Sequence, residues 1–379
     1  MRLLHTSDWH LGISFRGASA ADDQRYFIKQ ITEIIKEHGI DAVLIAGDIF
    51  DRSIASSEAI ELYDEAVTAI CAKLGAKLFV IAGNHDGAQR LSQCGKLLES
   101  AGLYVCGSLK REQKGIILGN TEIFLLPWIS TDKVRALYPE EAEGIASMQD
   151  AYELVCRKMR EAFTPGLKHI VLSHAFTVNA ETSVSDRSAE LGMASAVSGS
   201  VFDGFDYAAL GHIHKPQDAG ADIRYSGSPM PYSFGREEKQ EKSVTIIDTA
   251  DMSREIIPIK PLHRRTTLTG TYDELMHADI PDEVRRGYTK LIITDIHPGL
   301  EAISYLRERY DYPLEISGKQ FESDDASITL TPEEFEQRAR EPEEIFRQFC
   351  IDTGHEEPDA HFTELFREAQ AACEGADEE

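Results

Sequence analysis

The feature that most constrains this chain is a tetrapeptide, Gly83-Asn84-His85-Asp86, which directly follows the apolar run at residues 78–82. A buried strand that stops at a glycine delivers the next residues to the edge of its sheet, and in open α/β sheets ligands bind at that edge. A plain turn would explain one such tetrapeptide, because Gly, Asn and Asp all favour turns. Four more apolar strands end in Asp or His, however, so a shared site explains the pattern better.

These four strands are spread over residues 3–210. They are residues 3–7 before Asp8 and His10, residues 42–46 before Asp48, residues 169–172 before His174, and residues 207–210 before His212 and His214. Helical periodicity at residues 20–37 and 57–74 predicts the order β-α-β-α-β, which is typical of parallel strands with crossover helices. We therefore expect an α/β fold in which the polar residues lie at one edge of one sheet.

Further elements are predicted by the same signals. Apolar periodicity indicates helices at residues 92–101 and 148–163. Two apolar runs joined by Gly119-Asn120 predict a β-hairpin over residues 116–128. Other predicted elements are strands at residues 224–226 and 243–248 and a long surface loop at residues 179–200.

Changes in composition predict three domains in the 379 residues. Residues 1–260 carry the strand-end side chains, and residues 261–319 follow a proline-bounded boundary and predict a small β-α-β-α-β domain. Residues 320–379 hold 19 acidic and 4 basic side chains, together with two short amphipathic segments at residues 342–349 and 362–369. Helices this short are marginal alone in water, so we expect them to pack on another surface.

Composition also limits the class of protein. With 42% hydrophobic and 27% charged residues, the chain resembles an ordinary globular protein. No apolar run approaches the ~20 residues of a membrane-spanning helix, and the first residues lack a signal-peptide core, so we expect a cytoplasmic protein without a membrane partner. Six scattered cysteines favour reduced thiols. A net charge of −26 ordinarily argues against a nucleic-acid partner. The argument is weaker here because more than half of the excess negative charge lies in residues 320–379.

The strand-end side chains indicate a metal centre. They are Asp8, His10, Asp48, Asn84, His85, His174, His212 and His214. Mixed nitrogen and oxygen donors without thiolate suit Mn²⁺, Fe or Zn better than Ca²⁺. Eight donors exceed what one ion takes, whereas two ions about 3.5–4 Å apart that share a carboxylate would use them and suit phosphoester hydrolysis. Asp48, on the middle motif, is the natural bridge.

A lone histidine near a strand end is usually a core or surface residue. We assign that role to His5, His38, His169, His263, His355 and His361. Coincidence is a poor account of the five histidines that end apolar strands together with two aspartates and an asparagine.

Five motifs, in this order, resemble those of the calcineurin-like metallophosphoesterase superfamily. They are Asp8-x-His10, Gly47-Asp48-x-x-Asp51, Gly83-Asn84-His85-Asp86, Ser173-His174 and Gly211-His212-x-His214. Longer strings at residues 6–12, 47–52 and 202–217 are similar to those of its double-strand-break-repair nuclease branch. The resemblance implies a two-sheet core flanked by helices (α-β-β-α), with a small α/β cap domain and a C-terminal helical tail.

The resemblance also implies roles for individual residues. One divalent ion would be held by Asp8, His10, Asp48 and His214, and the other by Asp48, Asn84, His174 and His212. Mn²⁺ is the expected metal, with Mg²⁺ or Fe as alternatives. His85 would contact the scissile phosphate and steady the transition state or protonate the leaving oxygen. Asp86 is expected to fix its turn, and Asp51 and Arg52 to contact either ligands or phosphate, with a plain structural role as the alternative.

Partners follow from the same resemblance. In the cap, the candidates for contact with DNA phosphates are Arg264, Arg265, Arg285 and Arg286, with solvated charge as the alternative for each. The C-terminal amphipathic helices would dock on the coiled-coil root of an SMC-like ABC ATPase, the alternative being an acidic solubilising tail. Five phenylalanines favour docking, namely Phe335, Phe346, Phe349, Phe362 and Phe366. A homodimer, giving a heterotetramer with the ATPase, is a further expectation.

The sequence thus predicts a two-metal DNA nuclease, a 3′→5′ exonuclease on duplex ends and an endonuclease on single strands or hairpins. Polarity and dependence on ATP come from the resemblance alone. The rival among enzymes is a small-molecule phosphodiesterase or phosphoprotein phosphatase, because the metal motifs are shared. The rival from another class is a scaffold with a structural metal, which the complete set of ligands and His85 argue against.

Overall fold

The computed structural model describes residues 1–178, 180–182, 185, 196–296, 298–318 and 363–367. The chain divides into two compact units, Met1–Lys319 and Gln320–Glu379. In the second unit the description covers residues 363–367, which are helical. Most of the predicted loop at residues 179–200, the predicted helix at residues 342–349, and Phe335, Phe346, Phe349 and Phe362 lie outside the described residues. Of the helix predicted at residues 362–369, the described residues 363–367 are helical. Among the described helices, none combines the length and apolarity needed to cross a membrane.

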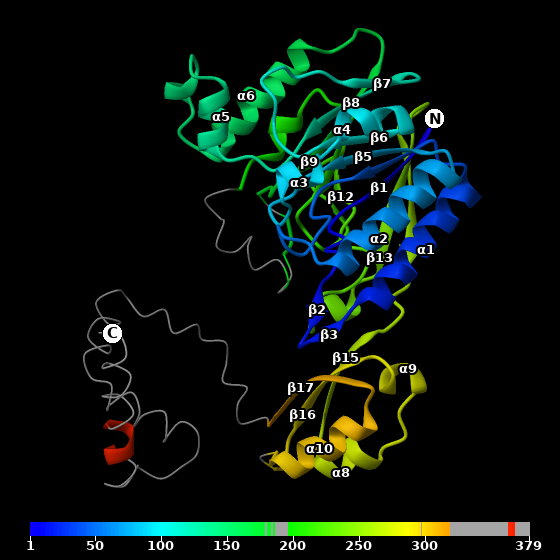
Figure 1. Ribbon diagram of the computed structural model, residues 1–379, viewed down its shortest axis with the longest axis vertical. Helices are drawn as coiled ribbons and strands as arrows, with labels where there is room; N and C mark the ends of the chain where they lie inside the picture. The colour runs from blue at the N-terminus through cyan, green and yellow to red at the C-terminus, as the bar shows by residue number, and fades with distance from the viewer. Residues whose placement is uncertain (179, 183–184, 186–195, 297, 319–362, 368–379) are drawn as a thin grey trace. The chain divides into compact units, whose positions relative to one another are not determined.

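The first unit contains two six-stranded sheets (Figure 1), and in one of them β1, β4, β5 and β6 are parallel and extend to one edge. Its strands, in spatial order, are β14 (Ser253–Ile259), β13 (Lys242–Asp248), β1 (Arg2–Thr6), β4 (Ala42–Ile45), β5 (Lys77–Ile81) and β6 (Leu103–Cys106). The last two strands of the domain, β13 and β14, extend this sheet in antiparallel fashion beside β1.

The second sheet also has a parallel centre, made by β12, β10, β9 and β8. Its strands, in spatial order, are β11 (Gln217–Asp218), β12 (Ile223–Tyr225), β10 (Tyr207–Gly211), β9 (Lys168–His174), β8 (Thr121–Leu126) and β7 (Ile116–Leu118). The hairpin predicted at Gly119-Asn120 is confirmed as β7 and β8.

The continuous apolar runs of the strands reflect burial on both faces of each sheet. In β4, Ala42 and Leu44 pack in the cluster between the two sheets. Val43 and Ile45 point the other way, into the cluster beneath the helices. Parallel strands covered on both faces are apolar throughout rather than alternating.

Helices cover the outer faces of the sheets, which confirms the predicted α-β-β-α core. On the first sheet, α1 (Ala21–His38) and α2 (Ser57–Val67) bury apolar stripes, such as Phe27, Ile31 and Ile35 of α1. Burial of each such side chain contributes about 1.5–3 kcal/mol. On the second sheet, α6 (Met148–Glu161) buries Tyr152, Val155 and Met159, and α5 (Thr131–Leu137) packs in the same cluster.

Two expectations from the sequence are corrected by the fold, and one strand is an addition to them. The strand-end residues do not share one sheet, because β8 returns the chain into a second sheet beside β9. The helix predicted at residues 92–101 is broken into α3 (Ala88–Leu91), α4 (Gly95–Leu98) and a 3₁₀ turn at Glu99–Ala101. Cys94 between them has a left-handed φ of 58°, which no helix accommodates. The strand β6 was not predicted.

Residues 265–318 form a three-stranded parallel sheet with helices, and the order predicted for residues 264–317 is confirmed. Its elements are β15 (Arg265–Gly270), α8 (Tyr272–His277), α9 (Asp282–Arg285), β16 (Tyr288–Ile293), α10 (Leu300–Arg309) and β17 (Tyr312–Gly318). The sheet has a small core of its own that includes Leu275, Leu291 and Leu306. It is joined to α1 by Asp23, whose carboxylate accepts hydrogen bonds from His263 Nδ1 and Tyr288 Oη, both at 2.8 Å.

Candidate metal centre

The predicted ligands meet where the carboxyl ends of parallel strands from both sheets face each other. Asp8, Asp48 and Asn84 follow β1, β4 and β5 of the first sheet, whereas His174 ends β9 and His212 follows β10 of the second. Ligands of α/β proteins bind beyond the carboxyl ends of the strands, and here two sheets supply one site.

The backbone is strained at this site. Seven described residues other than glycine have positive φ, and four of them are predicted ligands: Asp8 (53°), His10 (42°), Asp48 (49°) and His212 (100°). Such conformations cost about 1–3 kcal/mol each and gather at functional sites. The strain is a signal of function that is independent of the side-chain chemistry.

One half of the centre is built around Asp48 and His174. The Nδ1 of His174 lies 2.7 Å from Ala46 O, and its Nε2 lies 3.1 Å from Asn84 Oδ1 and 3.4 Å from Asp48 Oδ2. His212 Nδ1 lies 3.1 Å from the same Asn84 oxygen and 3.3 Å from His174 Nε2. Four candidate ligand atoms from the ends of four different strands therefore point at one another.

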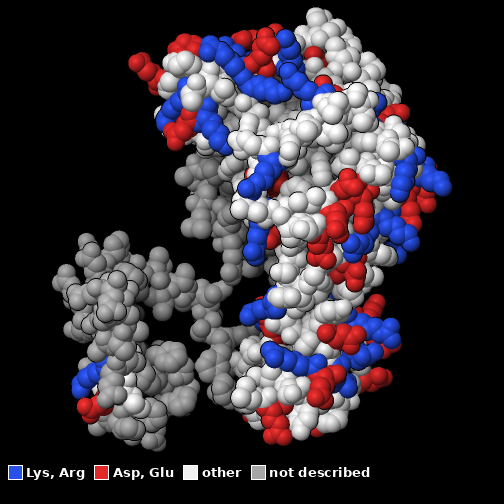
Figure 2. All heavy atoms as spheres, viewed as in Figure 1, with Lys and Arg blue, Asp and Glu red and all other residues white. Residues whose placement is uncertain are grey.

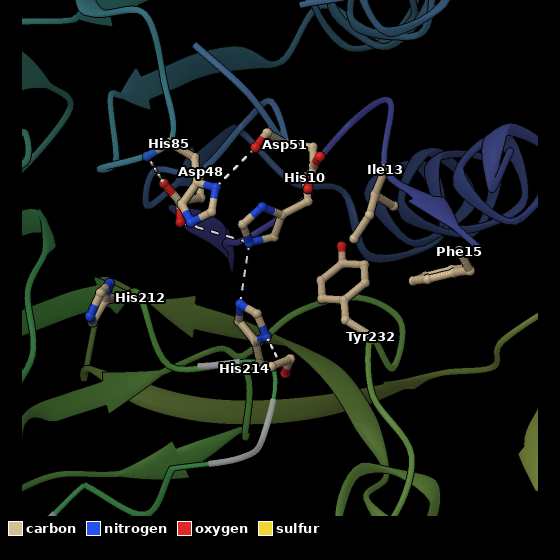
Figure 3. A pocket seen from close by; sticks show the side chains of 10 residues that line it. His10, Ile13, Phe15, Asp48, Asp51, His85, His212, His214 and Tyr232 are labelled. Carbon is tan, nitrogen blue, oxygen red and sulfur yellow. Dashed lines mark hydrogen bonds and ion pairs between the residues drawn. The ribbon is translucent and has the colours of Figure 1, made fainter. Parts of the chain in front are cut away.

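The other half contains Asp8, His10 and His214, whose ligand atoms lie within 4.8 Å of one another. The two Nε2 atoms of His10 and His214 are 3.2 Å apart, and His10 Nε2 lies 3.7 Å from Asp48 Oδ2 (Figure 3). The Asp8 carboxylate also accepts the backbone N–H of His212 at 3.0 Å, which ties the two sheets together. Asp48 faces both halves, as expected of a bridging ligand.

Glycines precede the ligands because the loops approach one another closely. A Cβ atom at Gly83 would lie 2.0 Å from Asp48 Oδ1, and a Cβ atom at Gly47 would lie 2.4 Å from His174 Nδ1. Gly47 also has a φ of 86°, which L side chains rarely adopt. The recurring glycine in the sequence is therefore a requirement of the site and not of a generic turn.

Asp86 fixes the loops that carry Asp48 and Asn84. One carboxylate oxygen accepts the N–H groups of Gly83 (2.8 Å) and Ile49 (3.1 Å), and the other accepts that of Phe50 (2.9 Å). Burial, together with the charge of Asp48, raises the pKa of Asp86 to about 6. The expectation that Asp86 fixes its turn agrees with this geometry.

The candidate ligands His10, Asp48, His212 and His214 line a cavity of about 190 Å³, and His85 lies at its wall. Its Nδ1 lies 2.9 Å from Asp51 O, and its ring meets that of His10 edge-on with centroids 4.9 Å apart. His10, Asp51 and His85 also place ligand atoms within 4.8 Å of one another, so geometry alone permits His85 as a ligand. Arg52 is largely exposed and pairs with Asp51 at 3.5 Å.

The electrostatics favour a cation at the centre. Burial alone would lower the pKa of His174, but the charge of Asp48 and the contact with it raise that pKa to about 9. Burial would raise the pKa of Asp48, but the charge and hydrogen bond of His174, together with the charges of His10 and His85, hold that pKa well below its usual range. Burial keeps the pKa of His10 and His212 low, that of His212 at about 3, so these two imidazoles are neutral, as ligands must be.

The donor set fits a divalent metal. The carbonyl of Ala46 can only accept, so His174 Nδ1 carries a proton and directs Nε2 at Asn84 and Asp48. This carbonyl-to-histidine contact is the usual support behind a metal ligand. Lone-pair atoms that face one another at 3.1–3.4 Å repel unless a proton or cation lies between them. Nitrogen and oxygen donors in this arrangement suit Mn, Fe or Zn.

Several residues of the site were not predicted from the sequence. The Tyr232 hydroxyl donates to the carbonyls of Asp8 and Trp9 at 2.9 and 2.8 Å, and Phe15 and Ser185 also line the cavity. Tyr232 lies in a turn-rich stretch without a strand-end motif, so no local signal could have identified it.

Trp128 was also missed. Its ring stacks on His212 with centroids 5.2 Å apart and an interplanar angle of 28°. It follows β8 at the same edge of the second sheet, and only the pairing of β8 with β9 brings it there.

Arg265 does not fit its predicted role. Its side chain is buried, with the guanidinium 3.9 Å from the Phe15 ring centroid and 5.1 Å from those of Phe234 and Tyr288. Its Nε donates to Pro231 O at 3.0 Å. Arg265 therefore joins the cap to the core and cannot reach a DNA phosphate.

The other cap arginines remain at the surface. Arg264 and Arg286 are exposed, and Arg285 pairs with Asp282 and Asp311 at 3.4 and 3.3 Å. Figure 2 shows basic and acidic side chains interspersed over this part of the molecule, without a patch of one sign. Their contact with DNA stays a prediction.

Comparison with known proteins places this geometry in a family. The chain belongs to the calcineurin-like phosphoesterase family, whose model matches residues 1–216. That segment contains every predicted ligand.

Particular relatives extend the match to most of the chain. It is 27% identical over 352 residues to a protein of Staphylococcus saprophyticus that is named as a subunit of the nuclease SbcCD, covering 92% of each chain. A protein of the same name from Staphylococcus epidermidis is 28% identical, over 85% of this chain and 86% of its own. Among solved structures, the protein TT1561 of Thermus thermophilus matches 68% of this chain and 99% of its own, with a TM-score of 0.38 and 11% identity.

Proposed function

We propose that the chain is a metal-dependent DNA nuclease of the SbcCD type, a 3′→5′ exonuclease on duplex ends and an endonuclease on single strands and hairpins. The observation that carries the proposal is the convergence of two carboxylates, one amide and four imidazoles on a single point, with His85 beside them. Membership of a phosphoesterase family supports hydrolysis of a phosphoester, and relatives named as nuclease subunits support a nucleic-acid substrate.

Two divalent ions, Mn²⁺ in our proposal, would occupy the centre. Asp8, His10, Asp48 and His214 would hold one, and Asp48, Asn84, His174 and His212 the other. When bound, such a pair supplies charge stabilisation to a phosphodiester and a nucleophile at neutral pH.

The chain's own residues hold this centre in place and act on the substrate. Asp86 holds the two loops that present Asp48 and Asn84. With its Nδ1 donating to Asp51 O, His85 keeps its ring beside His10, from where Nε2 can contact the scissile phosphate and protonate the leaving oxygen.

The partner proposals follow from the relatives and the sequence. We place the chain in a cytoplasmic complex with an SMC-like ABC ATPase of the SbcC type, in which a homodimer of this chain gives a heterotetramer. The acidic segment 320–379 would dock on the ATPase through its phenylalanine-bearing helices. Repair and recombination of DNA are the processes that such a complex would serve.

The test is cleavage of an end-labelled DNA hairpin by the purified protein with Mn²⁺, Mg²⁺ or chelator. We expect Mn²⁺-dependent cutting that chelator and the His85→Ala variant abolish, while the variant still binds metal. Absence of cutting, alone and with the ATPase added, together with fast hydrolysis of a small phosphodiester, would replace the nuclease by a small-molecule phosphodiesterase.

A further inference from the structure

A buried ion pair lies behind one half of the metal centre and takes no part in the chemistry proposed above. Glu237 Oε1 lies 2.8 Å from Lys242 Nζ, and the two side chains are 0% and 1% exposed. Charges buried this deeply are costly to desolvate, so a pair of this kind is weak evidence of stability by itself. Its other contacts point to a role at the metal centre.

Lys242 reaches the backbone of a predicted ligand. Its ammonium group donates to the carbonyl of His214 at 2.9 Å and to Ser228 Oγ at 3.0 Å, besides Glu237. Gln240 Oε1 is a fourth acceptor at 3.3 Å, so all three N–H groups are satisfied, and one of them fixes the peptide that carries His214.

Glu237 reaches the ring of the same ligand through a serine. Its second oxygen lies 2.8 Å from Ser185 Oγ, and Ser185 Oγ lies 2.7 Å from His214 Nδ1. The Lys242 ammonium lies 2.8 Å from the first oxygen, and the second oxygen is surrounded by the N–H groups of Tyr232 and Ser233 and by the Ser233 hydroxyl, so the carboxylate acts as an acceptor only. Ser185 must then donate to Glu237 and accept from His214 Nδ1–H. This direction leaves His214 Nε2 without a proton and aimed at His10.

The same carboxylate also holds the loop of Tyr232. Glu237 Oε2 accepts the backbone N–H groups of Tyr232 (3.1 Å) and Ser233 (2.7 Å). The Tyr232 hydroxyl in turn donates to the carbonyl of Asp8 at 2.9 Å, and its ring packs edge-on against those of His10 and His214 with centroids 5.2 Å away. All three residues of this half of the centre are therefore contacted by the network.

The other half has different supports. His174 is held by the carbonyl of Ala46, Asn84 by the loop that Asp86 fixes, and His212 by the Trp128 ring. The two halves of the centre can thus be perturbed separately.

We propose that the buried Glu237–Lys242 pair, acting through Ser185, is a positioning device for the Asp8/His10/His214 half of the metal centre, which sets the tautomer of His214. The inference rests on the proposed metal-dependent function and adds three positioning residues to it. Glu237 and Lys242 are buried behind the cavity, and Ser185 lies at its wall.

Ser185→Ala is the most direct test, because it removes the hydroxyl link and leaves the buried pair intact. Free Mn²⁺ is counted by its electron paramagnetic resonance signal during titration of the full-length protein. We expect two bound ions in the unmodified chain, and one of the two weakened about 10–100-fold in the variant, as is usual when the support behind a ligand is lost. Ser185→Thr keeps the hydroxyl and should restore the affinity. Ser198→Ala, a serine that caps the 3₁₀ turn Gly199–Phe202, should leave both ions unaffected.

The affected half is identified in two backgrounds. In Asn84→Ala, which impairs the other half, Ser185→Ala should weaken the remaining tight ion. In His10→Ala, which impairs the half supported by Ser185, the same change should have no further effect. An equal loss in both backgrounds, or none in either, would overturn the proposal.

Glu237→Gln tests the direction of the hydrogen bonds. An amide can donate to Ser185, which would reverse the hydrogen bonds that link residue 237, Ser185 and His214. Where this variant fails to fold, Glu237→Gln combined with Lys242→Met removes both charges together and avoids a lone buried ion. Folded variants of either kind should lose the same ion as Ser185→Ala, and two ions bound with unchanged affinity would contradict the inference. Failure of the unmodified chain to bind Mn²⁺ would instead contradict the proposed function.

Discussion

Two fully buried histidines, His5 and His174, show how differently one fold can treat the same side chain. Both are 0% exposed, and both contact a backbone carbonyl, Leu210 O at 3.1 Å and Ala46 O at 2.7 Å. Burial and the charge of Arg224 lower the pKa of His5 to about 3, whereas carboxylates raise that of His174 to about 9. Burial alone therefore does not make a cation site.

The difference lies in position along the strands. His5 lies inside β1, one residue before its end, and faces the second sheet, where its other nitrogen meets the hydroxyl of Tyr207 at 3.0 Å. His174 is the last residue of β9, where turns from the other sheet deliver Asp48 and Asn84. Both hydrogen-bond partners of His5 are neutral, whereas the open end places carboxylates beside His174.

The largest effect is expected for Asp48→Asn, which removes the charge that distinguishes the two environments. Losing the support behind a metal ligand costs about 10–100-fold, so losing the shared ligand itself should cost more than about 100-fold in DNA cleavage. Cleavage of the labelled hairpin in Mn²⁺ measures this.

Asp206→Asn is the matched control for Asp48→Asn. Asp206 precedes β10 at the end opposite to His212, and its carboxylate accepts the N–H of His169 at 2.8 Å. Cleavage should stay near that of the unmodified chain. Equal losses of cleavage in Asp48→Asn and Asp206→Asn would show that carboxylates at both ends of the sandwich are equally important. That result would contradict the special role of the open end.

Asp86→Asn should weaken Mn²⁺ binding by about 10–100-fold. An amide can accept on one side only, so either the N–H of Phe50 or those of Gly83 and Ile49 would face an NH₂ group. The loops that deliver charge to the open end would then shift. Mn²⁺ titration checks this, and unchanged affinity would show that the glycines hold these loops without the carboxylate.

His5→Gln should destabilise the fold by about 1–3 kcal/mol, the usual cost of disturbing buried hydrogen bonds, while Mn²⁺ binding stays unchanged. Urea unfolding in chelator provides the free energy. A loss of metal binding at equal stability would mean that the middle of the sandwich and its open end are coupled.

The effect of His5→Gln on stability should depend on pH in a definite direction. In the unfolded chain His5 takes up a proton near its ordinary pKa of 6.5, and in the folded chain near 3, so the unfolded state binds more protons between these values. The contribution of His5 to stability is therefore present above pH 6.5 and lost as the pH falls towards 3. Stability of His5→Gln should fall less steeply over this range than that of the unmodified chain.

The smallest effect is expected at His263, a partly exposed histidine with a single carboxylate partner. Its hydrogen bond to Asp23 raises the pKa of His263 above the ordinary value. The stability that this pair contributes is then complete below pH 6.5 and is lost as the pH rises through the raised pKa. Because His263 is partly exposed, we expect the difference in unfolding free energy between the unmodified chain and His263→Gln to change by less than about 1 kcal/mol over this range.

Unfolding free energies of the two proteins at several pH values measure this change. A difference that grows with pH would contradict the assignment. The pKa of His263 would then be lowered by folding, as that of His5 is, and not raised, as that of His174 is.

Much of the site could be predicted because its signals are local. Buried parallel strands appear in the sequence as apolar runs, and the residue after such a run lies at the edge of the sheet. The glycines at 47 and 83 mark loops that pass too close to Asp48 and His174 for a Cβ atom. All these signals span fewer than about ten residues.

The unpredicted residues lack such a signal. Glu237 and Lys242 look like two surface charges in a polar stretch, yet they are almost fully buried. Arg265 reads as a basic cap residue, and aromatic rings from three separate segments enclose it. Each environment is made by residues far away in the chain, which periodicity and composition do not report.

The sequence by itself determined which residues end the strands, and therefore which donor atoms the candidate metal centre contains. The tertiary structure decided that two sheets contribute them, which half of the centre each one joins, and what lies behind each ligand. The physical reason is that strand ends are defined by local burial, whereas sheet partners depend on contacts between distant residues. His174 and Asp48 are 126 positions apart and meet only because β9 and β4 face each other across the sandwich.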